Sequence, residues 1–187
     1  MVVARVNEPL LFTAEEMADI ADELGRCELI DGRIVSMAPT GAPHGEIEIE
    51  VAFHLRVWAK ATGRGRVMGG EVGLFIRRQP DTVRAADVLF ISHERYARRG
   101  PSGYLDVAPE LIVEIVSPED RFSQMTEKLA DYFSAGVDRV WILDPRVKRV
   151  FAYRSVTDVT VVEASETLTD EAVLPGFEVR VGDLFPE

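Results

Sequence analysis

The chain has 187 residues, of which 47% are hydrophobic and 28% charged, as in one ordinary globular domain. No apolar run approaches the roughly 20 residues that a membrane-spanning helix needs, and no secretory signal peptide is recognisable at the N-terminus. The formal net charge of -11 argues against a protein whose main task is to coat nucleic acid, and the single cysteine, Cys27, cannot form an internal disulfide. We therefore expect one cytoplasmic domain over residues 1–187, without a membrane partner.

Positive charge is concentrated in the middle third of the chain. Residues 1–55 carry 3 basic and 11 acidic side chains, residues 56–99 carry 10 and 4, and residues 100–187 carry 8 and 17. The net charges of the three parts are thus -8, +6 and -9. The basic third could provide solubilising charges on loops and a hairpin, or it could follow the phosphates of a nucleic acid.

The N-terminal part predicts a helix followed by a β-hairpin. Thr13 and Glu16 have the spacing of a capping box, so a helix is expected from about residue 13 to residue 24. Asp31-Gly32 lies between the apolar runs 27–30 and 33–37, and this dipeptide readily adopts the positive φ angles of a two-residue hairpin turn.

The next segment, residues 44–61, fits two patterns. Residues 46–51 alternate like a strand, whereas apolar residues recur at helical spacing over a longer window, at Ile47, Val51, Leu55 and Trp58. The length of the second pattern favours a helix. Two strands are then expected at 71–77 and 84–91, around the turn Gln79-Pro-Asp, and a short helix is expected to begin at Ser92.

The central segment predicts a strand, a helix and a second strand. Residues 111–116 form an almost unbroken β-branched run, typical of a strand buried on both faces. Residues 122–135 repeat apolar positions at helical spacing before Gly136, and residues 137–143 form another apolar strand. Because such a unit requires a right-handed crossover, its strands are expected to be parallel and adjacent or nearly so. With further strands between 149 and 184, the fold class is α/β or α+β, with a central mixed sheet flanked by helices.

Two carboxylates in apolar strands, Glu114 and Asp87, are the main candidates for a functional site. A buried carboxylate carries a high desolvation cost unless a cation or hydrogen-bond donors compensate it. The structural alternatives are that Glu114 faces solvent or an arginine, and that Asp87 only closes a turn. If the two acids converge from adjacent strands, they form an oxygen-ligand site for Mg²⁺, or Mn²⁺. Such a metal would activate a water and neutralise charge on a phosphate.

Lys128 is the third candidate, because it lies on the expected helix 14 residues after Glu114 and could extend over the end of the sheet. There it would polarise the attacking water or the scissile phosphate, although an ordinary solvated lysine would fit the same pattern.

Four further residues stay open as members of the site. Glu28 could be exposed or a fourth acid, and His44 could contact a phosphate or metal or only stabilise the start of a helix. Glu46 and Glu50, four residues apart, could approach the metal from a third direction or form a solvated helix face.

Several of these strings resemble the Uma-two family of predicted bacterial restriction endonucleases. The resemblance covers about residues 10–180 and rests on the segments 27–32, 84–91 and 111–118, together with His44, Glu127-Lys128, Tyr132, Gly136-Val137, Trp141 and Asp144. It implies the PD-(D/E)XK nuclease superfamily, with a restriction-endonuclease-like fold and a Mg²⁺-dependent site.

Within the resemblance, Asp87 corresponds to the superfamily's aspartate and Glu114 to its acidic strand residue. The superfamily's lysine usually lies two residues after that acid, where this chain has Val116, so the resemblance assigns its role to Lys128. Ala86 replaces the proline of the family's Pro-Asp, which removes no metal ligand.

We therefore expect a Mg²⁺-dependent endonuclease that hydrolyses phosphodiester bonds in DNA, with the basic third along the path of the DNA. Asp87 and Glu114 would be its metal ligands and Lys128 its third catalytic residue. The alternatives are a non-catalytic DNA-binding or assembly module with the same fold, and a metal-dependent hydrolase of small phosphate esters. A homodimer would suit the cleavage of both strands of a duplex, since that needs two sites.

Overall fold

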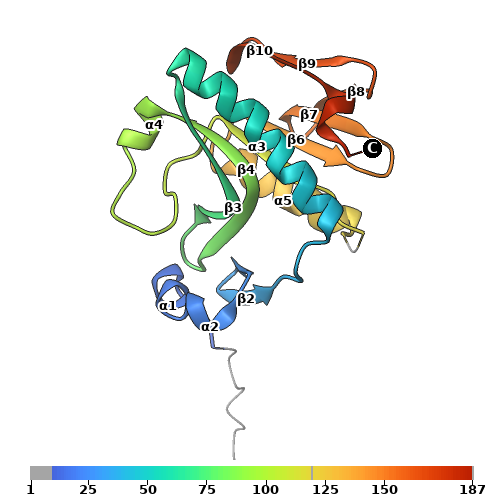
Figure 1. The fold of residues 1–187 in the computed structure, drawn as a ribbon. Helices are drawn as coiled ribbons and strands as arrows, with labels where there is room; N and C mark the ends of the chain where they lie inside the picture. Colours follow the sequence, from blue (N-terminus) through green and yellow to red (C-terminus); the bar gives the residue numbers. More distant parts are fainter. Residues whose placement is uncertain (1–9, 119, 187) are drawn as a thin grey trace, which may run out of the picture.

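An eight-stranded mixed sheet forms the centre of the structure, a computed structural model that describes residues 10–118 and 120–186 (Figure 1). Seven of its strands follow the order β2-β1-β4-β5-β6-β7-β8, and β3 pairs with β4. The strands are β1 (Cys27–Ile30), β2 (Arg33–Ser36), β3 (Gly65–Arg77), β4 (Thr82–Ser92), β5 (Leu111–Ile115), β6 (Arg139–Asp144), β7 (Arg149–Ser155) and β8 (Asp158–Val162). A separate two-stranded sheet contains β9 (Thr167–Asp170) and β10 (Leu174–Arg180).

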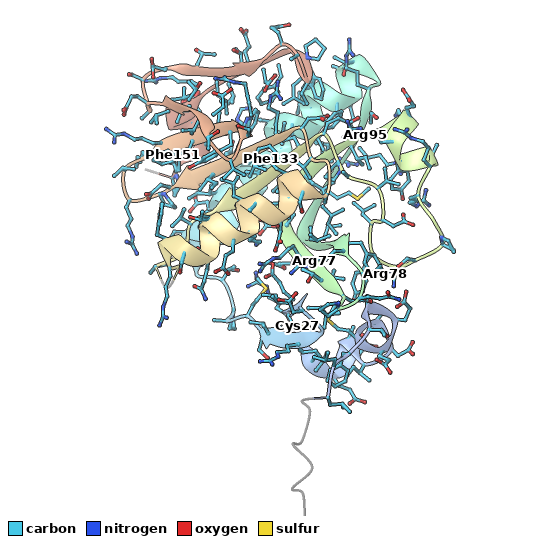
Figure 2. The ribbon with its side chains drawn as sticks, turned by 180° about the vertical axis from the view of Figure 1, so that it is seen from behind. Cys27, Arg77, Arg78, Arg95, Phe133 and Phe151 are labelled. Atoms are coloured by element: carbon cyan, nitrogen blue, oxygen red, sulfur yellow. The ribbon has the colours of Figure 1, made fainter. Side chains whose placement is uncertain are left out.

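Two long helices cover opposite faces of the large sheet. The first, α3 (Ala42–Thr62), packs its apolar stripe on a core cluster that also contains Val88, Val113 and Trp141. The second, α5 (Phe122–Ser134), packs on Leu89 and Ile112 from the other side, which faces the viewer in Figure 2. The remaining helices are α1 (Ala14–Asp19), α2 (Ala21–Leu24), α4 (His93–Ala97) and the 3₁₀ helix η1 (Val181–Leu184). Among the described helices, none has both the length and the apolar character needed to cross a membrane.

The predicted N-terminal hairpin is confirmed. β1 and β2 pair antiparallel from Cys27–Ser36 to Ile30–Arg33, and the turn residues Asp31 and Gly32 have φ angles of 50° and 73°. Positive φ at both positions is what a type I′ turn requires, which explains why Asp-Gly forms it. The hairpin joins the sheet through β1, so Glu28 faces the middle of β4.

The two edges of β4 pair differently. On the first edge, β3 pairs along the whole strand, from Thr82 to Ser92. On the other edge, β1 pairs only at Val83, while β5 pairs only with Val88, Leu89 and Phe90. Residues 84–87 therefore lie between two pairings and have no strand partner on this edge. We refer to this opening, residues 84–87 with the facing parts of β1 and β5, as the β4 fork.

The parallel pair around α5 is also confirmed, because β5 and β6 pair in parallel from Leu111–Arg139 to Ile115–Leu143. β6 begins two residues later than predicted, since the amide of Val137 donates instead to the carbonyl of Tyr132 at the end of the helix.

Two predicted boundaries were wrong. The helix expected at 13–24 is interrupted at Ile20, so that α1 and α2 are separate, although the capping box of Thr13 and Glu16 is present. The strand expected at 71–77 begins at Gly65, because β3 continues through an irregularity between Gly69 and Val72 that hides its regular pattern.

Candidate active site

An open pocket of about 720 Å³ lies over the β4 fork. Its walls come from β1, β4, β5, the start of α3, α5 and the loops that follow β2, β5 and β6. The charged residues at its base include all three residues predicted for the site and two more: Glu28, Arg84, Asp87, Glu114 and Lys128. The fold thus gathers charged side chains from four separate parts of the sequence.

Asp87 lies at the inner end of the β4 fork and is only 4% exposed. Its Oδ2 accepts a hydrogen bond of 2.7 Å from the backbone amide of Ile115, so the side chain replaces a strand carbonyl at the point where β4 and β5 separate. Because Val88 pairs with Val113, the register places Asp87 directly opposite Glu114 on the neighbouring strand. The two acids therefore lie on neighbouring strands, as expected.

Glu114 is 4% exposed, and two side chains of α5 offset the cost of burying its carboxylate. Its Oε2 accepts from Nζ of Lys128 at 2.7 Å, and its Oε1 accepts from the hydroxyl of Tyr132 at 2.6 Å. Lys128 and Tyr132 are four residues apart, so one face of the helix delivers both groups to the acid. The side chains of Lys128 and Glu114 are 14% and 5% exposed, so Lys128 is not an ordinary solvated lysine and Glu114 does not face solvent.

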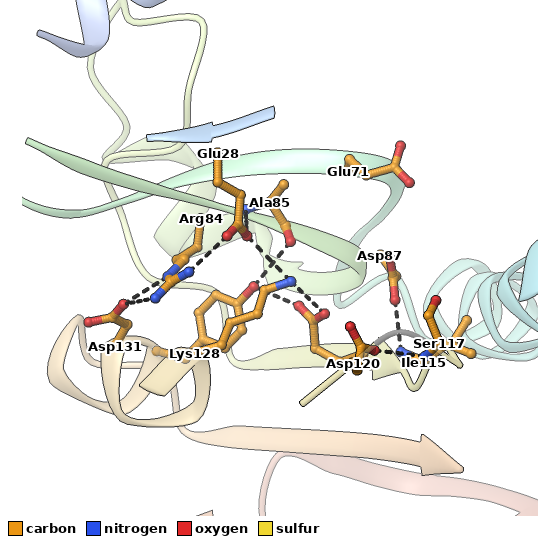
Figure 3. A network of polar contacts seen from close by, with 12 residues as sticks. Glu28, Glu71, Arg84, Ala85, Asp87, Ile115, Ser117, Asp120, Lys128 and Asp131 are labelled. Atoms are coloured by element: carbon orange, nitrogen blue, oxygen red, sulfur yellow. Dashed lines mark hydrogen bonds and ion pairs between the residues drawn. The ribbon is translucent and has the colours of Figure 1, made fainter. Parts of the chain in front are cut away.

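A second set of contacts connects Lys128 to Glu28 and Arg84 (Figure 3). Oε1 of Glu28 accepts from the amide of Ala85 at 2.9 Å and lies 3.4 Å from Nζ of Lys128, while its Oε2 accepts from Arg84 at 2.8 Å. Arg84 also donates to Asp131 at 2.8 Å. The result is a line of buried or half-buried groups with alternating charge: Asp131, Arg84, Glu28, Lys128 and Glu114.

Burial and these contacts shift the pKa values of four of the groups, and against the lowering effect of burial, Glu28 and Asp131 raise that of Arg84. Burial raises the pKa of Glu114 to about 8, against the opposing effect of Lys128. Burial alone would lower the pKa of Lys128, but the charges of Glu114 and Glu28 outweigh it and raise that pKa above its ordinary value. Burial would also raise the pKa of Glu28, yet Lys128 and Arg84 hold it below its usual range. Strongly perturbed ionisable groups in a pocket are typical of functional sites.

His44 joins the site from the first turn of α3. Its Nε2 lies 3.4 Å from Oδ1 of Asp87, and its Nδ1 lies 3.3 Å from the hydroxyl of Ser117. Burial lowers the pKa of His44, but Asp87 outweighs this effect and raises it. Nε2 is buried without a hydrogen-bond partner in the described residues, so its contact with Asp87 is a long ionic one. His44 therefore contacts the site instead of merely stabilising the start of a helix.

Glu46 and Glu50 do not reach the site. Glu46 is exposed, and Glu50 lies 3.4 Å from His54 on the outer side of α3. The apolar stripe of the helix fixes its inward face, which carries His44 and, one turn later, Glu48. Burial raises the pKa of Glu48, and the charge of Asp87 raises it further.

Two residues near the site were missed in the sequence, although both left a signal. Glu48 follows from the helical phase of α3, since it is four residues after His44 and next to the buried Ile47. Arg84 is a charged residue in the almost entirely buried strand β4, and by the argument applied to Glu114 it required a partner of opposite charge.

The arginines of residues 56–99 mostly have partners away from the pocket. Arg66 and Arg99 stack on the ring of Tyr96. Four others form ion pairs outside the pocket: Arg77 with Asp31 and Asp131, Arg78 with Glu15 and Asp81, Arg95 with Glu110 and Asp138, and Arg98 with Glu94. In Figure 2, Arg77 and Arg78 lie beside the N-terminal elements and Arg95 lies away from them. The basic residues that line the pocket are Arg26, Arg84, Lys128 and Arg146, of which only Arg84 belongs to the basic third.

Asp87 and Glu114 are the residues that could bind a metal ion. Within residues 10–118 and 120–186, no three His, Cys, Asp or Glu side chains are grouped closely enough to enclose a metal ion. Mg²⁺ needs fewer protein ligands, since it keeps several waters and is commonly held by one or two carboxylates and a phosphate. Each carboxylate oxygen of Asp87 and Glu114 accepts at most one hydrogen bond from the described residues and so keeps a lone pair. This donor set fits hydrated Mg²⁺ or Mn²⁺ and does not fit an enclosed zinc site.

Comparisons with known proteins bear on the family and the fold of the chain. A family model described as "Uma2: Putative restriction endonuclease" matches residues 14–182. The crystal structure of a "putative nuclease belonging to DUF820" from Anabaena variabilis is similar to this chain, with a TM-score of 0.73 and 21% sequence identity, over 85% of this chain and 89% of the other. No curated protein matches the chain significantly. The structural similarity confirms the predicted restriction-endonuclease-like fold.

Proposed function

The chain belongs to the Uma2 family, and from that membership we propose that it is a Mg²⁺-dependent endonuclease that hydrolyses phosphodiester bonds in DNA. The observation that carries the proposal is the base of the pocket. There, two buried carboxylates lie opposite each other on neighbouring strands, and a lysine of raised pKa contacts one of them at 2.7 Å.

In this proposal, Asp87 and Glu114 hold the metal. A bound Mg²⁺ supplies a Lewis acid that lowers the pKa of a coordinated water and neutralises charge on the phosphate. Lys128 donates a hydrogen bond to the attacking water or to the scissile phosphate. Glu114 and Glu28 raise its pKa, which keeps the amine protonated. Tyr132 holds Glu114 in place through its 2.6 Å hydrogen bond, and Glu28 holds Lys128.

Support for a polyanionic substrate comes from the rim of the pocket. Arg146 is exposed there, whereas Arg26, in the wall near the hairpin, is half-buried and paired with Glu71. An exposed arginine at such a position binds phosphate oxygens and orients a nucleic acid without reading its sequence.

The proposal is tested with purified protein, supercoiled plasmid and either Mg²⁺, Mn²⁺ or EDTA. We expect relaxed circles with either metal and none in EDTA. The rate should fall steeply with added salt, because phosphate contacts release counterions, whereas hydrolysis of bis(p-nitrophenyl) phosphate should be much less sensitive. Hydrolysis of the small ester without nicking would overturn the assignment of DNA as substrate. DNA binding without hydrolysis of either compound would instead identify a non-catalytic module.

Glu28→Gln is expected to reduce nicking by about 10-fold to 100-fold, the usual effect of removing a group that orients a catalytic residue. Lys128 loses one of its two carboxylate neighbours, while the amide oxygen of Gln can still accept from Ala85. DNA affinity, measured by fluorescence anisotropy in Ca²⁺, should stay unchanged. Glu94→Gln is the matched control, because that side chain is 85% exposed on α4, and equal losses in both variants would contradict the role of Glu28.

A further inference from the structure

The outer side of α3 carries an apolar stripe that the described chain does not cover. Ile49, Phe53 and Val57 follow one another at intervals of four residues and are 71%, 57% and 53% exposed. Figure 1 shows α3 across the front of the molecule, with no other element in front of it. Large apolar side chains grouped on one helix face in this way mark an interaction surface.

The charges beside this stripe are arranged symmetrically about Phe53. Glu50 lies three residues before Phe53 and Arg56 three residues after it. Glu46 lies seven residues before Phe53 and Lys60 seven residues after it, and Ile49 and Val57 lie four residues to either side. Each acid in the first half of the stripe is thus matched by a base at the same distance in the second half. Glu46, Arg56 and Lys60 are exposed and form no ion pair within the described part of the chain.

The exposed face of residues 46–60 is complementary to the same face of a second copy of the chain. Positions 46, 49/50, 53, 56/57 and 60 recur every 3.5 residues on average, the spacing of a seam between two packed helices. When two identical helices pack antiparallel about a two-fold axis at Phe53, each residue faces the one at the same distance on the other side. Glu46 then meets Lys60 of the second copy, Glu50 meets Arg56, and Ile49 meets Val57. A parallel pair would instead place Glu46 beside Glu46.

We propose that α3 is the interface of a two-fold symmetric homodimer, in which the helices of the two copies pack antiparallel around Phe53. The helix macrodipole does not account for the charge pattern, because its effect is confined to the first and last turns, and Glu50 and Arg56 lie in the middle of α3. His54 lies 3.4 Å from Glu50 on the same side of α3, and Arg56 forms no ion pair within residues 10–118 and 120–186.

The size of the seam sets the expected strength of the dimer. Residues 46–60 span about 21 Å along the helix axis. A single helix pair of this length buries less than the roughly 1,600 Å² of a standard interface, so the dimer should dissociate in the micromolar range. The apolar centre supplies most of the affinity, and the flanking charges supply the orientation.

The first test is the mass of the purified full chain, measured by sedimentation over roughly 1 to 300 µM. We expect the mass to rise from 20.8 kDa toward twice that value as concentration increases. Phe53→Glu should weaken association at least about 10-fold, because it places two like charges on the two-fold axis. A monomer throughout the concentration range would overturn the proposal, as would a Phe53→Glu variant that associates like the wild type.

The second test uses reversal of charge. Glu46→Lys and Lys60→Glu should each weaken association, because each creates two repulsive contacts per dimer. An equimolar mixture of the two variants should associate as heterodimers, and the double variant Glu46→Lys/Lys60→Glu should associate like the wild type. Unchanged melting temperatures check that all variants fold, since these side chains are exposed. A mixture that stays as monomeric as its components would contradict the antiparallel arrangement.

Discussion

Replacing Asp87 by asparagine is expected to lower the rate of plasmid nicking by about 100-fold to 1000-fold, with the fold preserved. The amide oxygen of asparagine can still accept the 2.7 Å hydrogen bond from Ile115, so this backbone amide keeps an acceptor where β4 and β5 separate. The negative charge that attracts the metal is lost. Alanine would be a poorer choice, because the buried amide of Ile115 would lose its acceptor, at a cost of about 1 to 3 kcal/mol.

The control is Asp158→Asn, which removes an exposed carboxylate on β8. Melting temperatures of both variants should match that of the wild type, so that lost activity reports the site alone. Raising the Mg²⁺ concentration should recover part of the activity of Asp87→Asn if its defect is weaker metal binding. Nicking by Asp87→Asn at the wild-type rate would show that the activity does not use this carboxylate.

Replacing Lys128 by methionine is expected to destabilise the protein as well as to inactivate it. The substitution leaves Glu114 and Asp87 close together without their cation, and removing one partner of a buried pair costs about 3 kcal/mol. For a chain of this length, the melting temperature in EDTA should fall by roughly 6 to 12 °C. Mg²⁺ should raise it again, since a bound cation stabilises the folded state.

A double substitution separates charge from packing. Lys128→Met/Glu114→Gln removes both charges of the pair, so most of the lost stability should return while nicking stays absent. Lys148→Met, on an exposed lysine that donates a hydrogen bond to the carbonyl of Pro186, should change neither property. A Lys128→Met variant as stable in EDTA as the wild type would show that the lysine does not compensate Glu114.

Local patterns in the sequence were sufficient to predict much of the fold. The Asp31-Gly32 turn, the buried run of β5 and the apolar repeat of α5 each depend on neighbouring residues only, and all three were predicted correctly. Asp87 and Glu114 could be selected for a related reason, since a carboxylate in an apolar strand stands out against its own neighbours.

The β4 fork could not be predicted in this way. It depends on where β1 and β5 stop pairing with β4, at Leu29–Val83 and Val88–Val113, and these registers join segments far apart in the sequence. The contacts of Glu28 with Arg84 and Lys128 follow from the fork and were therefore left open. Glu48 is a different case. The helical periodicity of α3 places it on the same face as His44, but the strand-like alternation of residues 46–51 obscured that periodicity.

The fork also determines how this site would change in a descendant that had given up catalysis. An acceptor at position 87 would still be needed to hold the amide of Ile115, so Asp or Asn should persist there under selection for folding alone. Glu114 and Lys128 compensate mainly each other, and an inactive descendant could exchange both together for apolar residues. In a comparison of homologous sequences, the joint retention of Glu114 and Lys128 would therefore distinguish working enzymes from inactive relatives, whereas an aspartate at position 87 would not.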